Sequence, residues 1–456
     1  MIASERSPIL PSRRGFLGNL ASGVGGLGLA SFLCSEGAFG FGGVDLARPH
    51  FPARAKRVIF LMMAGGPSHL DMLDPKPAIA RSAGQRPGGV DLRTERVTGG
   101  LLPSPFAFEK CGQSGIEVSE LLPHLKGVVD DLCVLRAVHG SNPNHGPATN
   151  FLMSGRIDQV HPSLGAWVSY GLGTENKSLP SFVSLGNSFS SSRNGYLPGE
   201  HQGTPIDLDK PSPDQMIRHL KNPRLDRARQ ERQLEFLRQA NAAHLAERPD
   251  DPLIEARIRS METAFRMQAA APEVFDIRKE DPATRALYGE GKFADSCLLA
   301  RRLVENGVRM VQVVNGGWDH HADISKEIRK KSKEIDQPIA GLITDLKRRG
   351  LLDDTLVIWG GEFGRTPVSE NGDGRDHNPF GFTMWMAGGG VKAGHIHGAT
   401  DEFGFRAVEG RVGVHDLHAT ILHLLGLDHE KLTYRYSGRD FRLTDVAGEV
   451  VRPILI

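Results

Sequence analysis

Short, continuous apolar runs that end in paired glycines recur along the chain. The first, Arg57 to Met63, leads into Gly65-Gly66, and three later runs over 308–314, 355–359 and 382–387 are each followed by two or three glycines. An apolar run of this length without alternation is typical of a strand that is buried on both faces. The pattern therefore predicts four core strands, each followed by a sharp turn.

Helical periodicity precedes two of these strands. Apolar residues recur at helical spacing over 292–306 and 330–349, and Gly307 and Gly350 stand where such helices would end. A helix, a glycine, a buried strand and a glycine pair form the repeating unit of a parallel sheet covered by helices. We predict an α/β fold with a doubly wound, mostly parallel sheet.

The segment from about 211 to 271 has a different character. It is rich in Arg, Gln and Glu, with Leu and Ala at helical intervals. This composition predicts a helical insertion whose charges form a solvated face. The simplest organisation is one domain over 41–456 that carries the insertion.

The first 40 residues are interpreted as an export signal. Ser12-Arg13-Arg14-Gly15-Phe16-Leu17 matches the twin-arginine pattern and precedes a weakly apolar run. The twin-arginine export machinery passes folded proteins, so we expect a periplasmic or secreted protein. No stable membrane span is expected apart from this segment, and 1–40 are left out of the predicted domain.

Charge and cysteine content narrow the function. A formal net charge of +1 over 456 residues argues against nucleic-acid binding. Beyond the signal, Cys111, Cys133 and Cys297 form no Cys-x-x-Cys pair, so no thiolate metal site is predicted. We expect each of the three to be a buried free thiol.

Acidic and histidine residues lie beside the predicted strand ends. In an open α/β sheet, ligands bind at the carboxyl ends of strands, where loops converge. We take the acidic and histidine residues beside these ends as candidate metal ligands and add one histidine on a predicted late helix. They are Asp71, Asp74, Asp319, His321, Glu362, Asp376, His377 and His418. Arg365, in the loop after the third strand, could grip an oxyanion through its guanidinium.

This ligand set favours divalent metal ions. Carboxylate and imidazole ligands without thiolates suit Zn²⁺ first, with Mn²⁺, Ca²⁺ or Mg²⁺ as alternatives. The residues are numerous enough for two ions. Two ions would stabilise the attacking and leaving oxygens of a displacement at phosphorus or sulfur.

Five motifs in a fixed order carry a resemblance to a known family. They cover 65–71 (GGPSHLD), 144–150 (NHGPATN), 317–321 (GWDHH), 361–367 (GEFGRTP) and 374–379 (GRDHNP). On these motifs the mature chain resembles the secreted family catalogued as domain of unknown function 1501. That family is similar in fold to the alkaline phosphatase and sulfatase superfamily, whose members hold metals at strand ends. The resemblance implies an alkaline phosphatase-like fold and hydrolysis of phosphate or sulfate esters.

The same resemblance places the nucleophile at the start of a helix, here near His145. Neither the Asp-Ser-Ala of phosphatases nor the Cys-x-Pro-Ser-Arg of sulfatases is present, which disfavours a formylglycine sulfatase. Three options remain: His145 as nucleophile or general base, Thr149 as nucleophile, or attack by a metal-bound hydroxide with help from His145. We favour the third; a purely capping or metal-ligating role for His145 stays open.

Two functions of different classes follow from these observations. The first is an exported metal-dependent hydrolase of phosphate or sulfate esters, acting on a small-molecule or polysaccharide substrate. The alternative is a non-catalytic secreted protein that binds a glycan or another partner on the same fold, which the missing nucleophile motif favours. The concentration of ligand-type residues favours the enzyme.

Overall fold

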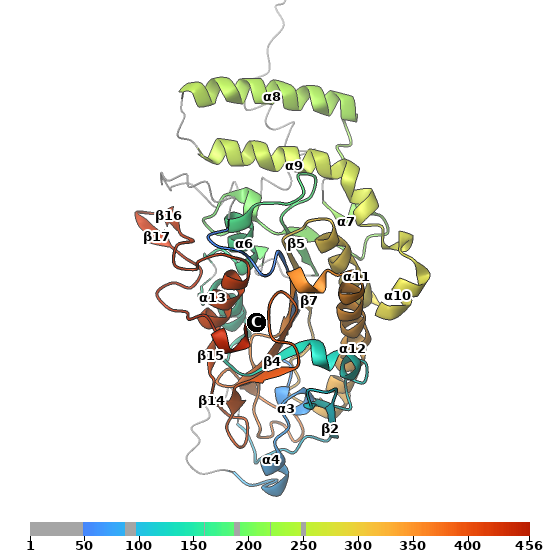
Figure 1. Cartoon of the computed structure of the whole chain (residues 1–456), viewed down its shortest axis with the longest axis vertical. Helices are drawn as coiled ribbons and strands as arrows, with labels where there is room; N and C mark the ends of the chain where they lie inside the picture. Colours follow the sequence, from blue (N-terminus) through green and yellow to red (C-terminus); the bar gives the residue numbers. More distant parts are fainter. Residues whose placement is uncertain (1–48, 87–96, 159, 187–191, 219, 248–251) are drawn as a thin grey trace, which may run out of the picture.

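A nine-stranded sheet runs through the middle of the molecule (Figure 1). The structure is a computed structural model that describes residues 49–86, 97–158, 160–186, 192–218, 220–247 and 252–456. The expected export signal lies outside these residues. The strands follow the order β12-β4-β11-β8-β1-β7-β5-β6, and β15 pairs with β4.

The four predicted core strands are all present in this sheet. They are β1 (Arg57–Met63), β7 (Met310–Asn315), β8 (Thr355–Gly360) and β11 (Phe382–Ala387). β1 pairs in parallel with β7 on one side and with β8 on the other. β5 (Phe182–Leu185) and β6 (Thr204–Ile206) continue the parallel sheet beyond β7. The predicted α/β fold with a mostly parallel sheet is confirmed.

One core strand runs against the others. β11 pairs antiparallel with both β8 and β4 (Leu132–His139). β4 in turn is parallel to β12 (His395–His397) and β15 (Val412–Gly413). Because β11 is reversed, the residues that precede it lie at the edge where the parallel strands end. Asp376 and His377 therefore reach the same edge as the loops that follow β1, β7 and β8.

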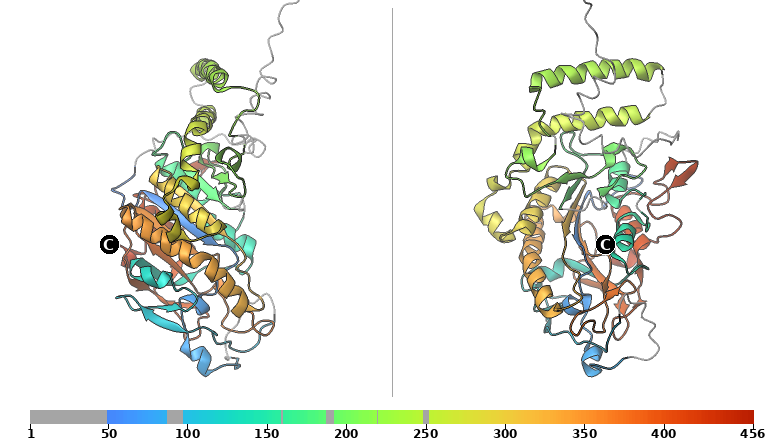
Figure 2. Two further views of the ribbon diagram at one scale, coloured as in Figure 1. Left: turned by 90° about the vertical axis from the view of Figure 1, so that its right-hand side faces the viewer. Right: turned by 180° about the vertical axis from the view of Figure 1, so that it is seen from behind.

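Side chains of β1 alternate between two hydrophobic cores. Ile59 and Leu61 are fully buried in one core, which includes residues of α11 (Lys292–Glu305) and α12 (Ile324–Arg348). Phe60 belongs to the other core, with residues of α6 (Leu164–Leu172) and α13 (Val414–Leu424). Helices thus cover both faces of the sheet (Figure 2), which explains why the β1 run is apolar without interruption.

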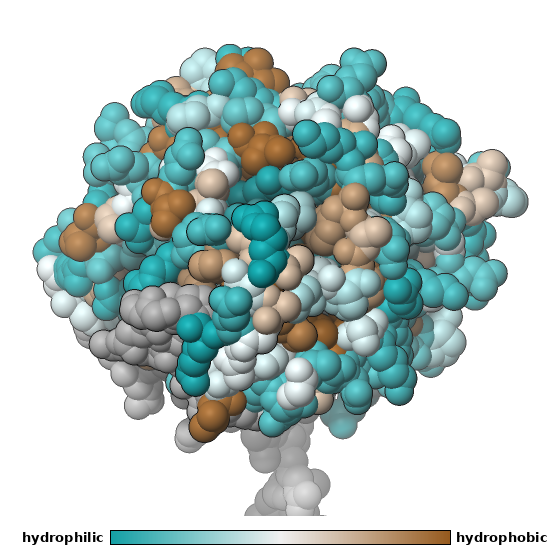
Figure 3. All heavy atoms as spheres, turned by 90° about the horizontal axis from the view of Figure 1, so that it is seen from below, coloured by the Kyte–Doolittle hydropathy of each residue, from teal (hydrophilic) through white to brown (hydrophobic). Residues whose placement is uncertain are grey.

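Two long helices lie side by side beyond the sheet, in the segment where a helical insertion was predicted. They are α8 (Arg227–Glu247) and α9 (Pro252–Val274) (Figures 1 and 2). Met267 and Ala271 of α9 are buried in the core that contains α11, so α9 is joined to the main body. The face seen in Figure 3 is predominantly hydrophilic, with apolar residues scattered over it. Among the described residues, no helix combines the length and apolarity that a membrane span requires.

The remaining elements are short. The helices are α3 (His69–Met72), α4 (Pro77–Arg81), α5 (His145–Ser154), α7 (Pro213–Met216) and α10 (Pro282–Tyr288). The 3-10 helices are η1 (Leu125–Asp131), η3 (Gly199–His201), η4 (Ile277–Lys279), η5 (Leu352–Asp354) and η6 (Arg452–Ile454). The other strands are β2 (Phe108–Cys111), β3 (Ile116–Ser119), β9 (Gly364–Arg365), β10 (His377–Asn378), β13 (Ala399–Thr400), β14 (Ala407–Glu409), β16 (Tyr434–Tyr436) and β17 (Arg439–Phe441). Cys111, Cys133 and Cys297 are buried free thiols, as expected.

Candidate metal centre

Asp319 stands among three histidines at the carboxyl edge of the sheet. Its Oδ1 lies 3.3 Å from Nε2 of His145, 2.9 Å from Nε2 of His321 and 3.0 Å from Nε2 of His377. His145 is the first residue of α5, Asp319 and His321 follow β7, and His377 lies in β10 just before β11. The fold thus brings together groups from three separate loops, as the positions at the strand ends predicted.

The second nitrogen of each histidine also faces an acceptor. Nδ1 of His145 lies 2.6 Å from Oε1 of Glu362, and Nδ1 of His321 lies 2.5 Å from Oε2 of Glu370. Nδ1 of His377 lies 2.7 Å from the carbonyl oxygen of Pro143. A carbonyl oxygen only accepts hydrogen bonds, so Nδ1 of His377 carries a proton. This contact fixes the orientation of the ring and leaves Nε2 facing Asp319, as an outer hydrogen bond does for many metal-binding histidines.

Two sets of ligand atoms come close enough to hold an ion. One consists of His145, Asp319 and His377, and the other of His321, Asp376 and His377; within each set the atoms lie within 4.8 Å of one another. The sets share His377, whose Nε2 can bind a single ion. Two ions at this place would therefore need a carboxylate that binds both of them. Asp319 is the carboxylate in position to do so, because it lies among all three imidazoles.

Two buried atoms beside these sets lack hydrogen-bond partners among the described residues. They are Nε2 of His145 and Oε2 of Glu362. Although Nε2 of His145 is 3.3 Å from Asp319, the pair does not have hydrogen-bond geometry. Buried polar atoms without partners are costly, and they are expected where a ligand or substrate completes the bonding.

The charges of the centre are strongly coupled. Burial disfavours a charged imidazole, but the carboxylates of Asp319 and Glu362 outweigh it and raise the pKa of His145 to about 9. Burial likewise opposes ionisation of Asp319, yet contacts with His145, His377 and Arg365 hold the pKa of its carboxyl far below the ordinary range. Without an ion, His145 is therefore protonated at neutral pH and Asp319 is ionised.

Arg365 holds loops together instead of facing a substrate. All three guanidinium nitrogens donate hydrogen bonds within the protein: Nε to the carbonyl of Gly66 at 2.8 Å, Nη1 to that of Arg375 at 3.0 Å, and Nη2 to Asp319 at 2.7 Å and the carbonyls of Gly65 and Trp318. The side chain is also buried. These contacts do not support the predicted oxyanion grip, because the donors are used to fix Asp319 and the loop after β1.

Asp71 and Asp74 have partners of their own outside the ligand sets. Asp71 is fully buried and pairs with Arg375, with Oδ2 2.9 Å from Nε. Burial opposes its charge, but Arg375 holds the pKa of Asp71 below its ordinary value. Asp74 accepts a hydrogen bond from the Thr400 hydroxyl at 2.6 Å and pairs with Lys76 at 3.1 Å. The structure does not support the prediction of either carboxylate as a metal ligand.

His418 is also placed away from the ligand sets. Its Nε2 lies 2.7 Å from the carbonyl oxygen of Leu152, so the ring ties α13 to α5. The ring is fully buried, and burial lowers its pKa to about 3. His418 is thus a neutral packing histidine, and its prediction as a ligand is not supported. Thr149, the alternative nucleophile, lies four residues after His145 on α5 and is partly exposed.

Two supporting groups were missed by the sequence analysis. Glu370 contacts His321, and the carbonyl of Pro143 contacts His377. Glu370 had a usable signal, because it is acidic and lies in the same loop as Glu362 and Asp376. A backbone carbonyl leaves no trace in a sequence, so the contact of Pro143 could not have been found.

Comparisons with known proteins complete the description of the site. A family model described as "Protein of unknown function (DUF1501)" matches residues 55–455. Similar solved structures include the PsFucS1 sulfatase from Pseudoalteromonas sp., with 14% identity over 83% of this chain and 69% of that one and a TM-score of 0.37. Others are the lipoteichoic acid synthase LtaP from Listeria monocytogenes (11% identity, 90% and 79% covered, TM-score 0.36) and TAB5 alkaline phosphatase (9%, 82% and 99%, 0.36). A search of curated proteins gives no match.

Proposed function

For this chain, which belongs to the DUF1501 family of proteins of unknown function, we propose the function of a metal-dependent hydrolase of phosphate or sulfate esters. The observation that carries the proposal is the arrangement of His145, His321 and His377 around one carboxylate oxygen of Asp319. The proposal rests on this geometry and on the chemistry of the donor atoms.

The contacts of the three histidines favour a bound cation. Each Nε2 faces Asp319 while each Nδ1 faces another acceptor. Two of the three Nδ1 atoms face carboxylate oxygens and the third faces a carbonyl oxygen, so Nε2 is the nitrogen of each ring that is left to bind a ligand. The ring centroids of His145 and His377 are 4.4 Å apart, and those of His321 and His377 are 4.7 Å apart. The three rings thus converge on one small volume, as the ligands of a single ion do. A divalent cation bound here would use these nitrogens as ligands and would offset the negative charge of the neighbouring carboxylates.

The second ligand set is the better place for the ion. His321, Asp376 and His377 would hold it, with Asp319 beside them. This assignment leaves His145 outside the ligand set, beside the carboxylates of Asp319 and Glu362 that favour its protonated form. The two ions predicted from the sequence would instead require His145 to lose its proton and become a ligand. The geometry therefore favours one ion per chain.

Residues around the ion have separate roles in the proposed hydrolysis. A divalent cation, when bound, supplies Lewis-acid stabilisation of the ester oxygens. Glu362 fixes the ring of His145 through Nδ1, and the Nε2 proton of His145 is placed for transfer to the leaving oxygen. The N–H groups of the first turn of α5, which begins at His145, favour the negative charge of the ester group.

The glycines after β1 support this arrangement. Gly65 has φ +118°, and a Cβ there would lie 2.7 Å from the backbone nitrogen of Asp319. Its N–H also donates to Oε1 of Glu362 at 2.9 Å. Only a residue without a side chain lets this loop pass so close to Asp319 while it holds Glu362.

Metal analysis combined with ester turnover tests the function. We expect about one transition-metal ion per chain in protein purified without chelators, together with hydrolysis of an aryl phosphate or aryl sulfate. Chelation should abolish the hydrolysis, and added Zn²⁺ or Mn²⁺ should restore it. Folded protein that binds no divalent ion and turns over neither ester would reject the proposal in favour of a binding protein.

The variant His145→Gln separates the two roles of His145. If His145 carries a proton, the variant keeps its metal content and loses activity, by a factor of about 10² to 10⁴. If His145 is a ligand, the metal content falls together with the activity.

We further propose that this hydrolase acts outside the cytoplasm. The support is the twin-arginine motif at Arg13-Arg14, with its apolar run to Leu33. Substitution of both arginines by lysine in the full chain should retain the protein in the cytoplasm, as measured by cell fractionation. Export of the double variant at the normal level would reject this route.

A further inference from the structure

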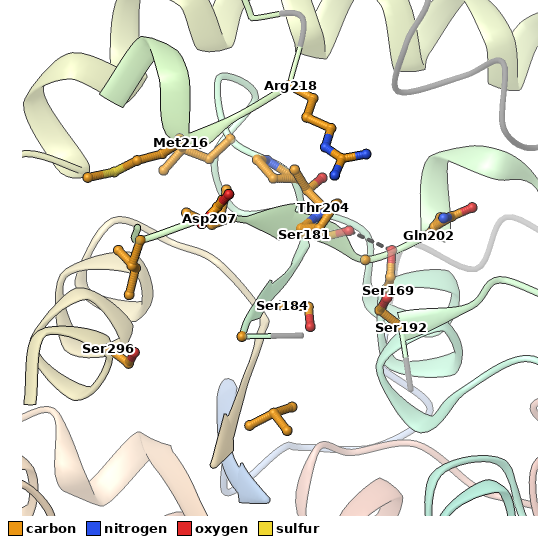
Figure 4. Close-up of a pocket in the computed structure, with 18 of the residues that line it drawn as sticks. Ser169, Ser181, Ser184, Ser192, Gln202, Thr204, Asp207, Met216, Arg218 and Ser296 are labelled. Atoms are coloured by element: carbon orange, nitrogen blue, oxygen red, sulfur yellow. Dashed lines mark hydrogen bonds between the residues drawn. The ribbon is translucent and has the colours of Figure 1, made fainter. Parts of the chain in front are cut away.

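A cavity of about 810 Å³ opens beside β5 and β6, separate from the histidine cluster (Figure 4). It lies between this end of the sheet and the helices α9 and α11, which contribute Thr263 and Ser296 to its wall. The volume is within the range of about 300–1,000 Å³ that is usual for small-molecule sites.

Apolar and charged residues share the wall of the cavity with many hydroxyl and amide side chains. Those labelled in Figure 4 are Ser169, Ser181, Ser184, Ser192, Gln202, Thr204 and Ser296. The side chains of Ser184, Gln202 and Thr204 make no hydrogen bond in the described part of the chain. Hydroxyl and amide groups both donate and accept, which suits a ligand that also carries many hydroxyl groups.

Part of this wall is fixed by a chain of hydrogen bonds. The hydroxyls of Ser169 and Ser181 are 2.5 Å apart, and Ser169 Oγ is 3.0 Å from Nδ1 of His201. Burial lowers the pKa of His201 to about 4, so the ring is neutral at pH 7. The wall is therefore polar and rigid without carrying charge at this point.

Most charged groups of the cavity are already paired. Lys292 lies 2.6 Å from Asp209, and Lys331 lies 2.5 Å from Glu334. The carboxylate of Glu200 is bound by Arg259 at 2.8 Å. These pairs cancel one another's charge and leave little net field in the cavity.

Arg218 differs from the other cations of the wall. It has no ion-pair partner in the described part of the chain, and its guanidinium points into the cavity (Figure 4). Asp207, the nearby acidic group, accepts a hydrogen bond from the backbone N–H of Asp209 at 3.0 Å. A guanidinium without a partner is suited to bind a carboxylate or another planar anion in a bidentate manner.

The cavity is continuous with the loop that carries the metal centre. Asn315 and Gly316 line it at the end of β7. The Asn315 side chain donates to Glu334 at 2.7 Å and accepts from Nε1 of Trp318 at 3.0 Å. Trp318 directly precedes Asp319, so the wall of the cavity and the metal centre share this loop.

We propose that this cavity binds an acidic saccharide, with its hydroxyls on Ser184, Gln202 and Thr204 and its anionic substituent on Arg218. This saccharide is the part of the ester that stays intact during hydrolysis. The inference rests on the proposed function for the reacting bond, but the binding itself does not require hydrolysis.

The test compares two sugars that contain no phosphate or sulfate ester. Binding of glucuronate and glucose to the purified full protein is measured by calorimetry or ligand-observed NMR. We expect glucuronate to bind about tenfold more tightly than glucose, because an ionic hydrogen-bonded pair is added. Arg218→Ala should remove this difference and leave glucose binding unchanged. Arg348→Ala, an exposed arginine at the far end of α12, serves as the matched control and should behave as wild type.

The possible results of this test separate the binding inference from the proposed function. Failure of wild-type protein to bind glucuronate, or an equal preference for glucuronate in Arg218→Ala, would overturn the inference. Arg218 is exposed, so its replacement should leave the fold intact. A protein that binds glucuronate through Arg218 but hydrolyses no ester would keep this inference and reject the proposed function.

Discussion

Nδ1 of His145 lies 2.6 Å from Oε1 of Glu362, and the same oxygen accepts a hydrogen bond from the backbone N–H of Gly65. Glu362 is thus joined both to the proposed proton carrier and to the loop after β1. Its carboxylate is buried, so its charge acts on His145 with little screening by water.

Glu362→Gln should shift the pH dependence of hydrolysis. Loss of the carboxylate removes one of the groups that raise the pKa of His145 to about 9. A proton donor is active only below its pKa, so the decline of kcat at alkaline pH should begin at a lower pH in the variant. We expect kcat to fall by a factor of about 10 to 100 with metal content unchanged. A pH–rate profile checks this, and an alkaline limb at the wild-type position would contradict it.

His377→Ala should remove most of the bound metal, whichever of the two ligand sets holds the ion. His377 belongs to both ligand sets, whereas Asp376 and His145 each belong to one. Elemental mass spectrometry should find less than a tenth of the wild-type metal per chain, since loss of one of few ligands weakens binding strongly.

Asp74→Asn is the matched control for that variant. Asp74 was predicted as a ligand, but the structure pairs it with Thr400 and Lys76. Its metal content should equal that of the wild type. Loss of metal in Asp74→Asn with retention in His377→Ala would reverse the assignment of the site.

Arg365→Lys should destabilise the protein even when no metal is present. Lysine cannot reproduce the fork of hydrogen bonds from Arg365 to Asp319 and to the carbonyl of Gly66. Arg365 is buried, and a buried charge that loses its partners costs about 3–5 kcal/mol. Urea unfolding of chelated protein measures the loss. A variant of wild-type stability with only a raised KM would restore the role of a direct oxyanion grip.

His418→Gln should reduce the sensitivity of the fold to acid. The unfolded chain binds this proton near the ordinary pKa of 6.5, whereas burial lowers the pKa of folded His418 to about 3. Stability from this group is therefore complete above pH 6.5 and falls as the pH is lowered towards 3. Between pH 7 and pH 5 the loss amounts to about 2 kcal/mol.

Glutamine keeps an N–H donor for the carbonyl of Leu152 but does not titrate. Urea unfolding at pH 7 and pH 5 should show that the variant loses about 2 kcal/mol less than the wild type. Equal losses in the two proteins would show that His418 is not held neutral.

The sequence predicted the core strands and the edge of the sheet at which the site lies, because both depend on local pattern. The apolar run of β1 reflects burial against two cores, and the Gly65-Gly66 turn places the next loop at the strand end. The direction of β11 was not predictable from pattern, because Phe382–Ala387 has the same apolar character and the same trailing glycines as the parallel strands. Strand direction is decided by pairing across the sheet.

The roles of individual charged residues were less predictable for a related reason. Asp71 and Asp319 both follow core strands, yet one binds Arg375 and the other faces three histidines. Arg375 lies 304 residues after Asp71 in the chain. A partner at that distance is fixed by the tertiary fold, so sequence spacing alone could not separate a buried ion pair from a metal ligand.

The central position of β1 also affects how the protein folds during its synthesis. Met63 pairs with Asn315 and Met62 with Gly360, so both neighbours of the first strand are translated long after it. During synthesis, both edges of this apolar strand stay unpaired until most of the chain has left the ribosome. Pairing of this kind is slow, and it exposes an aggregation-prone segment in the meantime. We therefore expect folding to be largely post-translational, and expression of the chain to depend on chaperones that bind nascent polypeptides.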